Sequence, residues 1–437
     1  MTCPRPDRRT LIKAGIGAPA LMSTFSAAAR GASRHGLAAT DLAADVRRYA
    51  EAGDKKSGGP GDRWTADWTA ERLFLAGYQV ERQAFDAPFF EPGVCGLDLD
   101  DSRLSIIAQL PVVATPPGGI TAPLRLADVA ERLDGAIAVV RLPYRRWSTL
   151  LDPAAREPII AAAARGAVAV LVITTGPTGE ALALNAAAEK PVVSVPLGII
   201  APRSAGPIVD AARTGREARL TIEGAIGHRK AENIIGVRPI EGGRWIVVST
   251  PRSGWTSCAG ERGPGIAIWL ALAAWLPSAY PDHSLLLLNN SGHEFENLGA
   301  KRVIETFGPP PQHTALWLHL GANVAARDWH ELPDRLLPLP SADPYRFLMT
   351  SEDLVAAART IFAGQPGLEA AYPSQAGAAG ELREIVAAGY PRHAGIFGAH
   401  RQHHAASDDM ETIVPDALLA AADGCFRLMT YALSKRT

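Results

Sequence analysis

Between residues 40 and 85, apolar side chains recur first at helical spacing and then at alternate positions. Residues 40–53, TDLAADVRRYAEAG, have the apolar period of an amphipathic helix, and Thr40 stands where an N-cap residue would. The next pattern, which carries Trp64, Trp68 and Leu73, predicts a second helix with Asp62 as its cap and Gly77 at its end. The next residues, YQVERQAF, alternate as the side chains of a half-buried strand do.

From residue 231 onwards, strand patterns and helix patterns alternate. The apolar strand runs RWIVVST, HSLLLLNNS and HTALWLHLG are separated by the helix patterns GPGIAIWLALAAWL and FENLGAKRVIETF. Strands joined by helices of this length pair in parallel, because each helix carries the chain back to the same end of the sheet. The sequence therefore predicts an α/β domain with a mostly parallel central sheet.

Residues 95–225 have a different texture from the segments on either side. Short strand patterns, among them GAIAVVRLP, AVAVLVITT and KPVVSVPLGII, surround one alanine-rich helix pattern, EPIIAAAARG. The segment ends in a further strand pattern, EARLTIEG. We therefore predict a compact β-rich unit at 95–225, inserted into a larger α/β domain formed by residues 36–94 and 226–437.

Composition and charge place the chain among ordinary globular proteins. It has 437 residues, of which 47% are hydrophobic and 20% are charged, and this length suits about two to three domains. The formal net charge of -1 gives no reason to expect nucleic acid as a partner. Since no apolar run reaches the roughly 18 residues that a membrane-spanning helix needs, we expect a protein that does not span a membrane. The oligomeric state is left open.

The N-terminus resembles a twin-arginine export signal. Arg8 and Arg9 are followed by Lys13, a modest apolar stretch and the small residues 27–29. We expect residues 1–35 to form this signal segment and the mature protein to be periplasmic or secreted. The alternative is a short surface helix whose charges are placed by chance.

Polar residues gather at the predicted strand ends of the C-terminal half. In parallel sheets with helical connections, functional side chains lie beyond the carboxyl ends of the strands. Imidazole and carboxylate groups from several strand ends are common ligands of zinc, and a catalytic site uses three of them and keeps one position open. The four cysteines include no C-x-x-C pair, so we expect no cysteine-based metal site. The residues at these strand ends are Arg252, Ser253, Glu261, Arg262, His293, Glu294, His319, His400, His403, His404, Asp408 and Asp409.

Several of these residues also have a purely structural interpretation. His319, in its apolar strand, would serve as a core histidine, and Glu261 and Arg262 would pair with each other at a helix start. The late histidine cluster would lie in a solvated loop. Glu294 is the hardest to explain in this way, because its strand is too apolar to leave a carboxylate without a function. We interpret Glu294 as a ligand or a base.

The order of several motifs resembles that of a known enzyme family. SGGPGDRWTADWTAERLFLAGYQV is similar to the family's opening helix, and LDGAIAVVRLP, AAAARGAVAVLVIT and KPVVSVP resemble its inserted protease-associated domain. ENIIGVRPIEGGRWIVVS resembles the entry into its catalytic domain, and ELREIVAAGYP and HHAASDDMETI resemble its last two motifs. The family comprises the zinc aminopeptidases related to bacterial leucyl aminopeptidase, aminopeptidase Y, glutamate carboxypeptidase II and glutaminyl cyclase. The resemblance covers nearly the whole mature chain. It implies a three-layer α/β/α peptidase domain of the phosphorylase/hydrolase-like type, with a small inserted β-rich protease-associated domain.

The resemblance also implies a site, and here the sequence departs from the family pattern. The first ligand motif of active members, His-x-Asp, falls on Pro251 and Ser253, and proline cannot bind zinc. The other positions of the family pattern are all filled by polar residues. They are Glu261 for the metal-bridging acid, His293 and Glu294 for a base followed by a ligand, His319 for the ligand of the third strand, and His404, with Asp408 after it, for the closing histidine.

The surviving ligands permit one zinc ion rather than two. One metal position would keep Glu261, Glu294 and His404. His319 would add a fourth ligand or donate a hydrogen bond. His293 takes the place of the base, and a neutral imidazole, with an unperturbed pKa of about 6.5, accepts a proton from water. The predicted substrate-binding residues are Arg252 and Arg262, which would grip a substrate carboxylate, Ser253, and Trp255, which would form a pocket wall or simply pack in its loop.

The sequence favours one function and leaves two others open. The first is an exported zinc-aminopeptidase-like metallohydrolase, which acts on the amide bond of a peptide or small amide with one zinc ion. Both hydrolysis and cyclisation fit this description. The second is a non-catalytic binding protein on the same scaffold that has lost its metal site. The third is a metal-free enzyme that uses Ser253 or His293, although no G-x-S-x-G motif surrounds Ser253.

Overall fold

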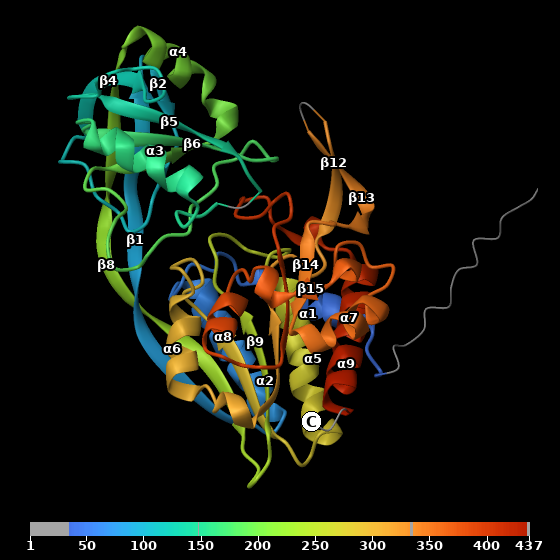
Figure 1. The fold of residues 1–437 in the computed structure, drawn as a ribbon. Coiled ribbons are helices and arrows are strands. Elements are labelled where there is room, and N and C mark those ends of the chain that lie inside the picture. Colours follow the sequence, from blue (N-terminus) through green and yellow to red (C-terminus); the bar gives the residue numbers. More distant parts are fainter. Residues whose placement is uncertain (1–34, 147, 333–334, 435–437) are drawn as a thin grey trace, which may run out of the picture.

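The computed structural model describes residues 35–146, 148–332 and 335–434. It has two lobes, which we define by sequence: the small lobe is residues 95–225, and the large lobe is the rest of the described chain (Figure 1). Residues 1–34, on which the predicted export signal falls, lie outside the described residues. Within the described ranges, no helix combines the length and the apolar character needed to cross a bilayer.

The large lobe is built on one sheet whose central strands run parallel (Figure 1). In the order in which they lie side by side, its strands are β15 (Tyr372–Pro373), β14 (Arg346–Thr350), β16 (His393–Gly398), β11 (Thr314–Leu320), β9 (Trp245–Pro251), β10 (Ser284–Asn290) and β8 (Glu217–Arg238). β16, β11, β9 and β10 pair in parallel, whereas β14 and β8 flank them in antiparallel orientation. The parallel centre confirms the prediction from strand and helix alternation.

Helices cover both faces of this sheet (Figure 1). Alternate residues of β9 enter two different cores, because side chains of a strand point to opposite faces in turn. Ile246 and Val248 pack in the core on one face of the sheet, and Val247 packs in the core on the other face. This arrangement confirms the three α/β/α layers. The helices of the first core are α1 (Ala39–Glu51), α2 (Pro60–Leu75), α5 (Gly263–Ala279), α7 (Val355–Ile361) and α9 (Pro415–Ser434), and those of the second are α6 (Leu298–Phe307) and α8 (Leu382–Ala387).

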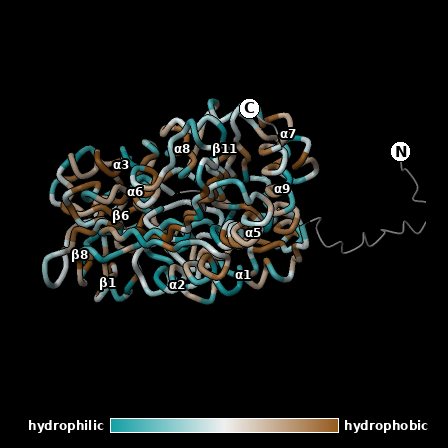
Figure 2. The backbone as a smooth tube through the Cα atoms, turned by 90° about the horizontal axis from the view of Figure 1, so that it is seen from below, coloured by the Kyte–Doolittle hydropathy of each residue, from teal (hydrophilic) through white to brown (hydrophobic). Residues whose placement is uncertain are grey.

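α5 is the central helix of the larger core. Every residue from Gly263 to Leu270 is buried, and the helix is apolar on all sides. A helix without a polar face belongs inside a protein, and Figure 2 shows the hydrophobic colour along α5. Pro264 lies in the first turn, where a missing N–H has no cost. The start of α5 directly follows Glu261 and Arg262, so the buried helix fixes both side chains at the sheet edge.

The small lobe has two helices of its own, and its strands continue the hydrogen-bonded order of the large sheet through β8. Its strands are β2 (Ser102–Leu104), β3 (Ile107–Ala108), β4 (Ile120–Leu126), β5 (Ile137–Tyr144), β6 (Ala169–Thr175) and β7 (Leu197–Ile200), and its helices are α3 (Pro153–Ala164) and α4 (Gly206–Thr214). β4, β5, β6 and β7 pair in parallel. α3 packs on one face of this sheet and α4 on the other.

A long antiparallel ribbon joins the two lobes (Figure 1). β1 (Gln79–Leu99) pairs with β8 along almost its whole length. At the bulge of this ribbon, a Cβ atom on Gly224 would lie 2.2 Å from the carbonyl oxygen of Glu91, so glycine is needed there. The strand predicted at 78–85 is thus only part of a strand of 21 residues. The predicted domain boundaries at 95 and 225 fall inside these continuous strands.

The remaining elements lie around the sheet edge and on the surface. A hairpin of β12 (Arg327–Glu331) and β13 (Leu336–Ala342) rises from the large lobe beside the small lobe (Figure 1). Short 3-10 helices connect several of the larger elements. They are Pro202–Ser204, Pro311–His313, Glu352–Leu354, Leu368–Ala370, Ser374–Ala376 and Met410–Thr412.

Candidate metal centre and active-site cleft

The carboxyl ends of the central strands carry the titratable side chains of the site. β9, β10 and β16 lead at this edge into loops at 252–262, 291–294 and 399–408. These segments are far apart in the sequence, and they meet because parallel strands all end on the same side of the sheet. His319 is the second-last residue of β11 and lies at the same edge. The small lobe overhangs this edge (Figure 1).

Glu261, His403 and His404 form a group of buried potential metal ligands. One ligand atom from each residue lies within 4.8 Å of the other two. Nε2 of His404 lies 3.6 Å from Oε1 of Glu261, and Nδ1 of His403 lies 4.0 Å from the same oxygen. The two imidazole rings stack with their centroids 4.2 Å apart. Two imidazoles and one carboxylate with an open fourth position are a known ligand set of catalytic zinc sites.

Glu261 is a buried carboxylate beside a buried guanidinium. Nη2 of Arg262 lies 2.7 Å from Oε1 of Glu261. Burial raises the pKa of Glu261, but the charge of Arg262 and the neighbouring histidines together hold this pKa well below its ordinary value. Neither carboxylate oxygen has a hydrogen-bond partner among the described residues. Glu261 is therefore ionised and still has lone pairs for a ligand.

The two imidazoles of this group are neutral near pH 7. Burial lowers the pKa of His404 to about 4, and burial lowers the pKa of His403 well below its ordinary value. A metal ligand must be unprotonated on the binding nitrogen, and a neutral imidazole meets this condition. Nδ1 of His404 lies 2.7 Å from the hydroxyl oxygen of Ser148 and 3.1 Å from the carbonyl oxygen of Ala183. Nε2 is left to face Glu261.

Asp408 ties two loops of the site together. Its carboxylate accepts hydrogen bonds from the backbone N–H groups of Gly260, at 2.7 Å, and Glu261, at 3.0 Å. It also accepts a hydrogen bond from the hydroxyl of Thr412 at 2.9 Å. Nε2 of His400 lies 3.5 Å from Asp408. Burial lowers the pKa of His400, but Asp408, together with Glu261 and Asp343, raises this pKa above its ordinary value. Asp408 thus holds the backbone that presents the Glu261 carboxylate.

Glu294 is held by hydroxyl groups rather than by histidines. Oε1 accepts hydrogen bonds from the backbone N–H and the hydroxyl of Ser57, both at 2.7 Å, and Oε2 accepts one from Ser253 at 2.6 Å. Burial raises the pKa of Glu294, although these hydrogen bonds oppose the shift. Among the described residues, Glu261, Glu294 and His404 do not form a group whose ligand atoms all lie within 4.8 Å of one another. The structure thus places Glu294 apart from the other two predicted ligands.

Arg252 is part of a fully buried ion pair. Its Nε atom lies 2.9 Å from Oδ1 of Asp62, and both side chains are almost completely enclosed. Nη1 of Arg252 donates a hydrogen bond to the carbonyl oxygen of Asn289 at 2.7 Å. Asp62 also accepts hydrogen bonds from Gly58 at 2.7 Å and from Ser291 at 2.8 Å. These contacts join the start of α2 to the ends of β9 and β10.

The other predicted substrate contacts have different surroundings. Nε1 of Trp255 donates a hydrogen bond to Oδ1 of Asn185 at 2.7 Å, and the indole packs edge-on against Phe295. Trp255 lines a second cavity, to which His404 also contributes, while Ser253 is bonded to Glu294 as described above. Of the four predicted substrate contacts, Arg262 is the one that lines the cleft between the lobes.

His293 and His319 each contact a polar partner near the cleft. Nδ1 of His293 lies 3.3 Å from Oε1 of Glu381, and Glu381 also accepts a hydrogen bond from the side-chain amide of Asn290 at 2.9 Å. Burial raises the pKa of Glu381, but His293 lowers it below its ordinary value. Burial also lowers the pKa of His293. Nδ1 of His319 lies 2.9 Å from the hydroxyl oxygen of Ser249, and burial lowers the pKa of His319 to about 4.

The histidines open into a cleft of about 400 Å³ between the two lobes. One wall is aromatic: the rings of Tyr345 and Phe347 have centroids 5.0 Å apart, and Phe347 and Phe397 have centroids 5.2 Å apart. The small lobe contributes Ser148 and Asn185 to the opposite side. The polar groups of the large lobe that line the cleft include Arg262, His293, His319, Glu381, His403 and His404. The cleft thus combines an apolar wall with a polar floor, as substrate sites commonly do.

The sequence interpretation names His403 only as one polar residue of a cluster and does not mention Glu381 or Ser148. His403 stands next to the predicted ligand His404, and its own imidazole was a visible candidate. Glu381 begins the motif ELREIVAAGYP, where an acid among apolar residues at the start of a helix is a signal for a buried carboxylate. Ser148 gives no such signal, because a serine in a loop between strands is ordinary.

Comparison with known proteins establishes the fold. No protein-family model and no curated protein matches the sequence. A zinc aminopeptidase from Bacillus subtilis is similar, with 18% identity and a TM-score of 0.70 over 91% of this chain and 95% of that one. An aminopeptidase from Aneurinibacillus sp. has 17% identity and a TM-score of 0.63 over 90% and 93% of the two chains. A peptidase precursor from Shewanella amazonensis has 17% identity and a TM-score of 0.67 over 91% and 96%. These likenesses confirm the predicted resemblance to the zinc aminopeptidase fold.

Loss of the charge at Arg252 should destabilise the protein. In Arg252→Met, Asp62 would remain as a buried carboxylate without its guanidinium partner, so we expect the free energy of unfolding to fall by about 3–5 kcal/mol. Urea denaturation measures this change. The matched control is Arg82→Met, because Arg82 pairs with Asp67 on the surface and such pairs contribute at most about 1 kcal/mol. Unchanged stability combined with weaker substrate binding would instead support Arg252 as a substrate contact.

Proposed function

We propose that this protein is an exported metallohydrolase that cleaves peptide-like amide bonds with one zinc ion. The observation that carries the proposal is the convergence of Glu261, His403 and His404 beside the cleft. Glu261 and His403 keep buried polar atoms that have no hydrogen-bond partner in the described part of the chain, and a cation would satisfy them. Similarity to the fold of zinc aminopeptidases supports zinc as the metal and an amide bond as the target.

The proposed ligand set differs from the one that the family resemblance implies. Glu261 and His404 belong to both sets, whereas His403 takes the place of Glu294, whose oxygens are bonded to serines. Two histidines and one glutamate suit a catalytic zinc with an open position. When bound, the zinc ion would polarise the substrate carbonyl and lower the pKa of a bound water to about 7.

His293 is the proposed general base. Its Nδ1–H donates to the carboxylate of Glu381, so Nε2 carries the lone pair that accepts a proton. Glu381 fixes the ring and stabilises the imidazolium that forms, as an acid does behind a catalytic histidine. His319, whose Nδ1 contacts Ser249, presents its ring to the cleft as a further polar contact for the substrate. The aromatic wall offers space for one apolar side chain of the substrate.

A metal-free binding protein is the second candidate, and one contact favours it. Arg262 already neutralises Glu261 at 2.7 Å, so a zinc ion would have to share this carboxylate with the guanidinium. Without zinc, Arg262 would be the cationic group through which the cleft holds its ligand. A metal-free enzyme based on Ser253 is less well supported, because its hydroxyl donates to Glu294 and not to an imidazole base.

Metal content should separate these candidates. Full-length protein that is stripped with a chelator and reloaded should bind about one equivalent of zinc, measured by mass spectrometry of the metal. Glu261→Gln, His403→Ala and His404→Ala should each reduce bound zinc to less than about half an equivalent, because each removes one of three ligands.

The control for these ligand substitutions is His393→Gln. His393 is also a buried histidine, but it lies at the opposite end of β16 and contacts Ser374. This variant should keep the zinc content of the wild type. A wild-type protein that binds less than about half an equivalent would refute the zinc site and support the metal-free binding protein.

Removal of the Glu381 charge should slow the chemical step. In Glu381→Gln, His293 loses the carboxylate that fixes its tautomer and stabilises its protonated form. We expect kcat for hydrolysis of aminoacyl anilides to fall about 10²–10⁴-fold, with little change in KM. Glu384→Gln is the control, because Glu384 lies in the helix that Glu381 precedes but contacts Asn297 and Arg383 instead of a histidine. An unchanged kcat in Glu381→Gln would exclude the proposed base pair.

Export should depend on the paired arginines at the N-terminus. Arg8 and Arg9 belong to residues 1–34, outside the described part of the chain, so this proposal rests on the sequence pattern. Replacement of both by lysine should retain the protein in the cytoplasm, which cell fractionation measures. Replacement of Lys13 by glutamine is the control and should leave export largely intact. Normal export of the double lysine variant would contradict a twin-arginine signal.

A further inference from the structure

The small lobe contacts the proposed metal ligand His404 directly. Ser148 follows β5 and Ala183 follows β6, and both contact Nδ1 of His404, which belongs to the large lobe. Ser148 and His404 are buried, with 6% and 3% of their surfaces exposed, so water does not replace this contact easily. The bond between them joins residues 256 positions apart in the chain. The second coordination sphere of the site is thus supplied by the other lobe.

The hydrogen bonds of Ser148 determine which ring nitrogen of His404 carries the proton. Ser148 donates its hydroxyl proton to the carbonyl oxygen of Ala183 at 2.6 Å. A hydroxyl has a single proton, so the Ser148 oxygen can only accept a hydrogen bond from His404. The carbonyl oxygen of Ala183 is likewise only an acceptor. Because both neighbours of Nδ1 are acceptors, Nδ1 carries the proton and Nε2 carries the lone pair.

This tautomer leaves a gap between lone pairs at the proposed metal position. Nε2 of His404 faces Oε1 of Glu261 at 3.6 Å, which is too long for a hydrogen bond between them. Nδ1 of His403 lies 4.0 Å from the same oxygen and has no hydrogen-bond partner within the described ranges. A cation among these three atoms would give each of them an electrostatic partner.

We infer that the small lobe completes the metal centre, with Ser148 and the carbonyl group of Ala183 fixing the ring orientation and tautomer of His404 for zinc. The inference rests on the proposed zinc function and adds a role for the inserted lobe. Ser148 is a positioning residue, because it touches the ligand and not the substrate. Hydrogen bonds to the non-binding nitrogen of a ligating histidine strengthen metal binding by presetting the ring.

A second set of contacts holds the small lobe against the same loop. Nη1 of Arg146, in the small lobe, lies 3.0 Å from Oδ1 of the buried Asp343. Arg401, which precedes the histidine pair, contacts the same carboxylate at 3.3 Å. On the other side of the histidine pair, the backbone N–H of Ser407 donates to Glu180 of the small lobe at 3.3 Å. The small lobe therefore contacts the segment 401–407 directly at Ser407 and is joined to Arg401 through Asp343 of the large lobe.

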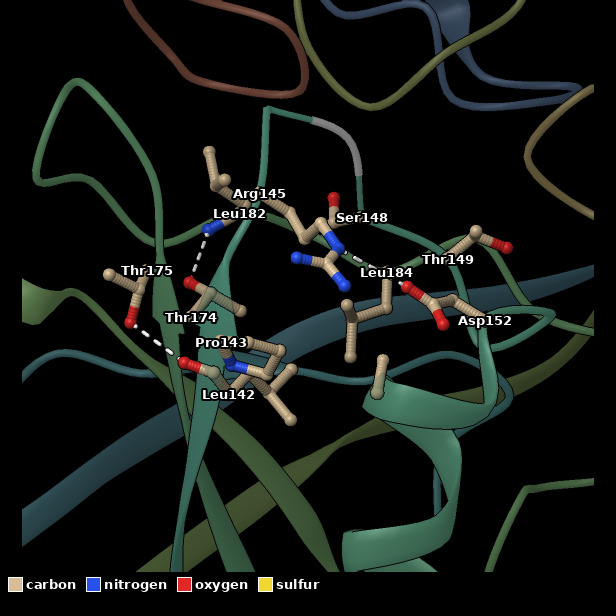
Figure 3. Close-up of a pocket in the computed structure, with 11 residues that line it drawn as sticks. Leu142, Pro143, Arg145, Ser148, Thr149, Asp152, Thr174, Thr175, Leu182 and Leu184 are labelled. Carbon is tan, nitrogen blue, oxygen red and sulfur yellow. Dashed lines mark hydrogen bonds and ion pairs between the residues drawn. The ribbon is translucent and has the colours of Figure 1, made fainter.

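The surroundings of Ser148 allow a clean substitution. Figure 3 shows Ser148 at the edge of a small pocket, with its hydroxyl pointing away from Leu184. Removal of this hydroxyl leaves the apolar interior of the small lobe unchanged. Thr175 appears in the same view and donates its hydroxyl proton to the carbonyl oxygen of Leu142 at 3.0 Å, wholly within the small lobe. Thr175→Val is therefore a matched control that removes a hydroxyl without changing a contact to His404.

Zinc affinity measures the role of Ser148. Full-length wild type, Ser148→Ala and Thr175→Val are titrated with zinc in competition with a chromophoric chelator. We expect Ser148→Ala to raise the Kd for zinc about 10–100-fold, and Thr175→Val to leave it unchanged. Equal affinities of wild type and Ser148→Ala would overturn the inference while leaving the proposed function intact.

The tautomer of His404 is measured separately, in the metal-free protein. Nitrogen-15 NMR of histidine-labelled wild type, with the signal assigned through His404→Gln, should show the proton on Nδ1. A proton on Nε2 would overturn the inference. If the wild type binds no zinc, the proposed function fails, and the NMR result still decides whether the small lobe positions this ring.

Discussion

A buried carboxylate has to be neutralised, and the way in which Glu261 is neutralised determines what the site can do. Arg262 supplies a positive charge close to one oxygen, while no hydrogen bond uses the lone pairs within the described part of the chain. His403 and His404 stand beside it as uncharged imidazoles, so they contribute lone pairs but no charge. Charge and coordination are therefore provided by different groups. A cation could therefore bind at this site without a rearrangement of the surrounding protein.

The other buried acids at this sheet edge have different hydrogen-bond or ion-pair partners. Most of these contacts join neighbouring elements of the large lobe. Asp62 pairs with Arg252 and joins α2 to the strand ends. Glu294 accepts hydrogen bonds from two serines, and Asp408 accepts them from backbone amides. Glu381 differs, because its partner His293 lines the cleft with it. Because all four acids are buried, burial does not distinguish their roles. Their partners do: Asp62, Glu294 and Asp408 join elements of the fold, whereas Glu381 contacts a histidine of the cleft.

The fold follows from local pattern, whereas the partners of buried polar groups do not. Strand and helix periods predict the parallel sheet, and the sheet brings the polar residues of the site to one edge. The partners of Glu294 and His404 are Ser57 and Ser148, which lie 237 and 256 residues away in the chain. Serines are common in loops and carry no periodic signal, so nothing local marks these two. For the same reason, the sequence does not show that the oxygens of Glu294 are already bonded, or that His403 lies beside the metal position.

The ribbon of β1 and β8 also has a consequence for how the chain folds. Its outer end pairs Asp98 with Arg219, which are 121 residues apart, and the separation grows toward Gln79 and Val237. Closing such a large loop costs conformational entropy unless the intervening chain is already compact. The small lobe is that intervening chain, and it has its own apolar cores. Early collapse of this lobe would bring the two strands together, and their pairing would then extend toward the large sheet. The insertion would thus reduce the conformational entropy lost when β1 pairs with β8.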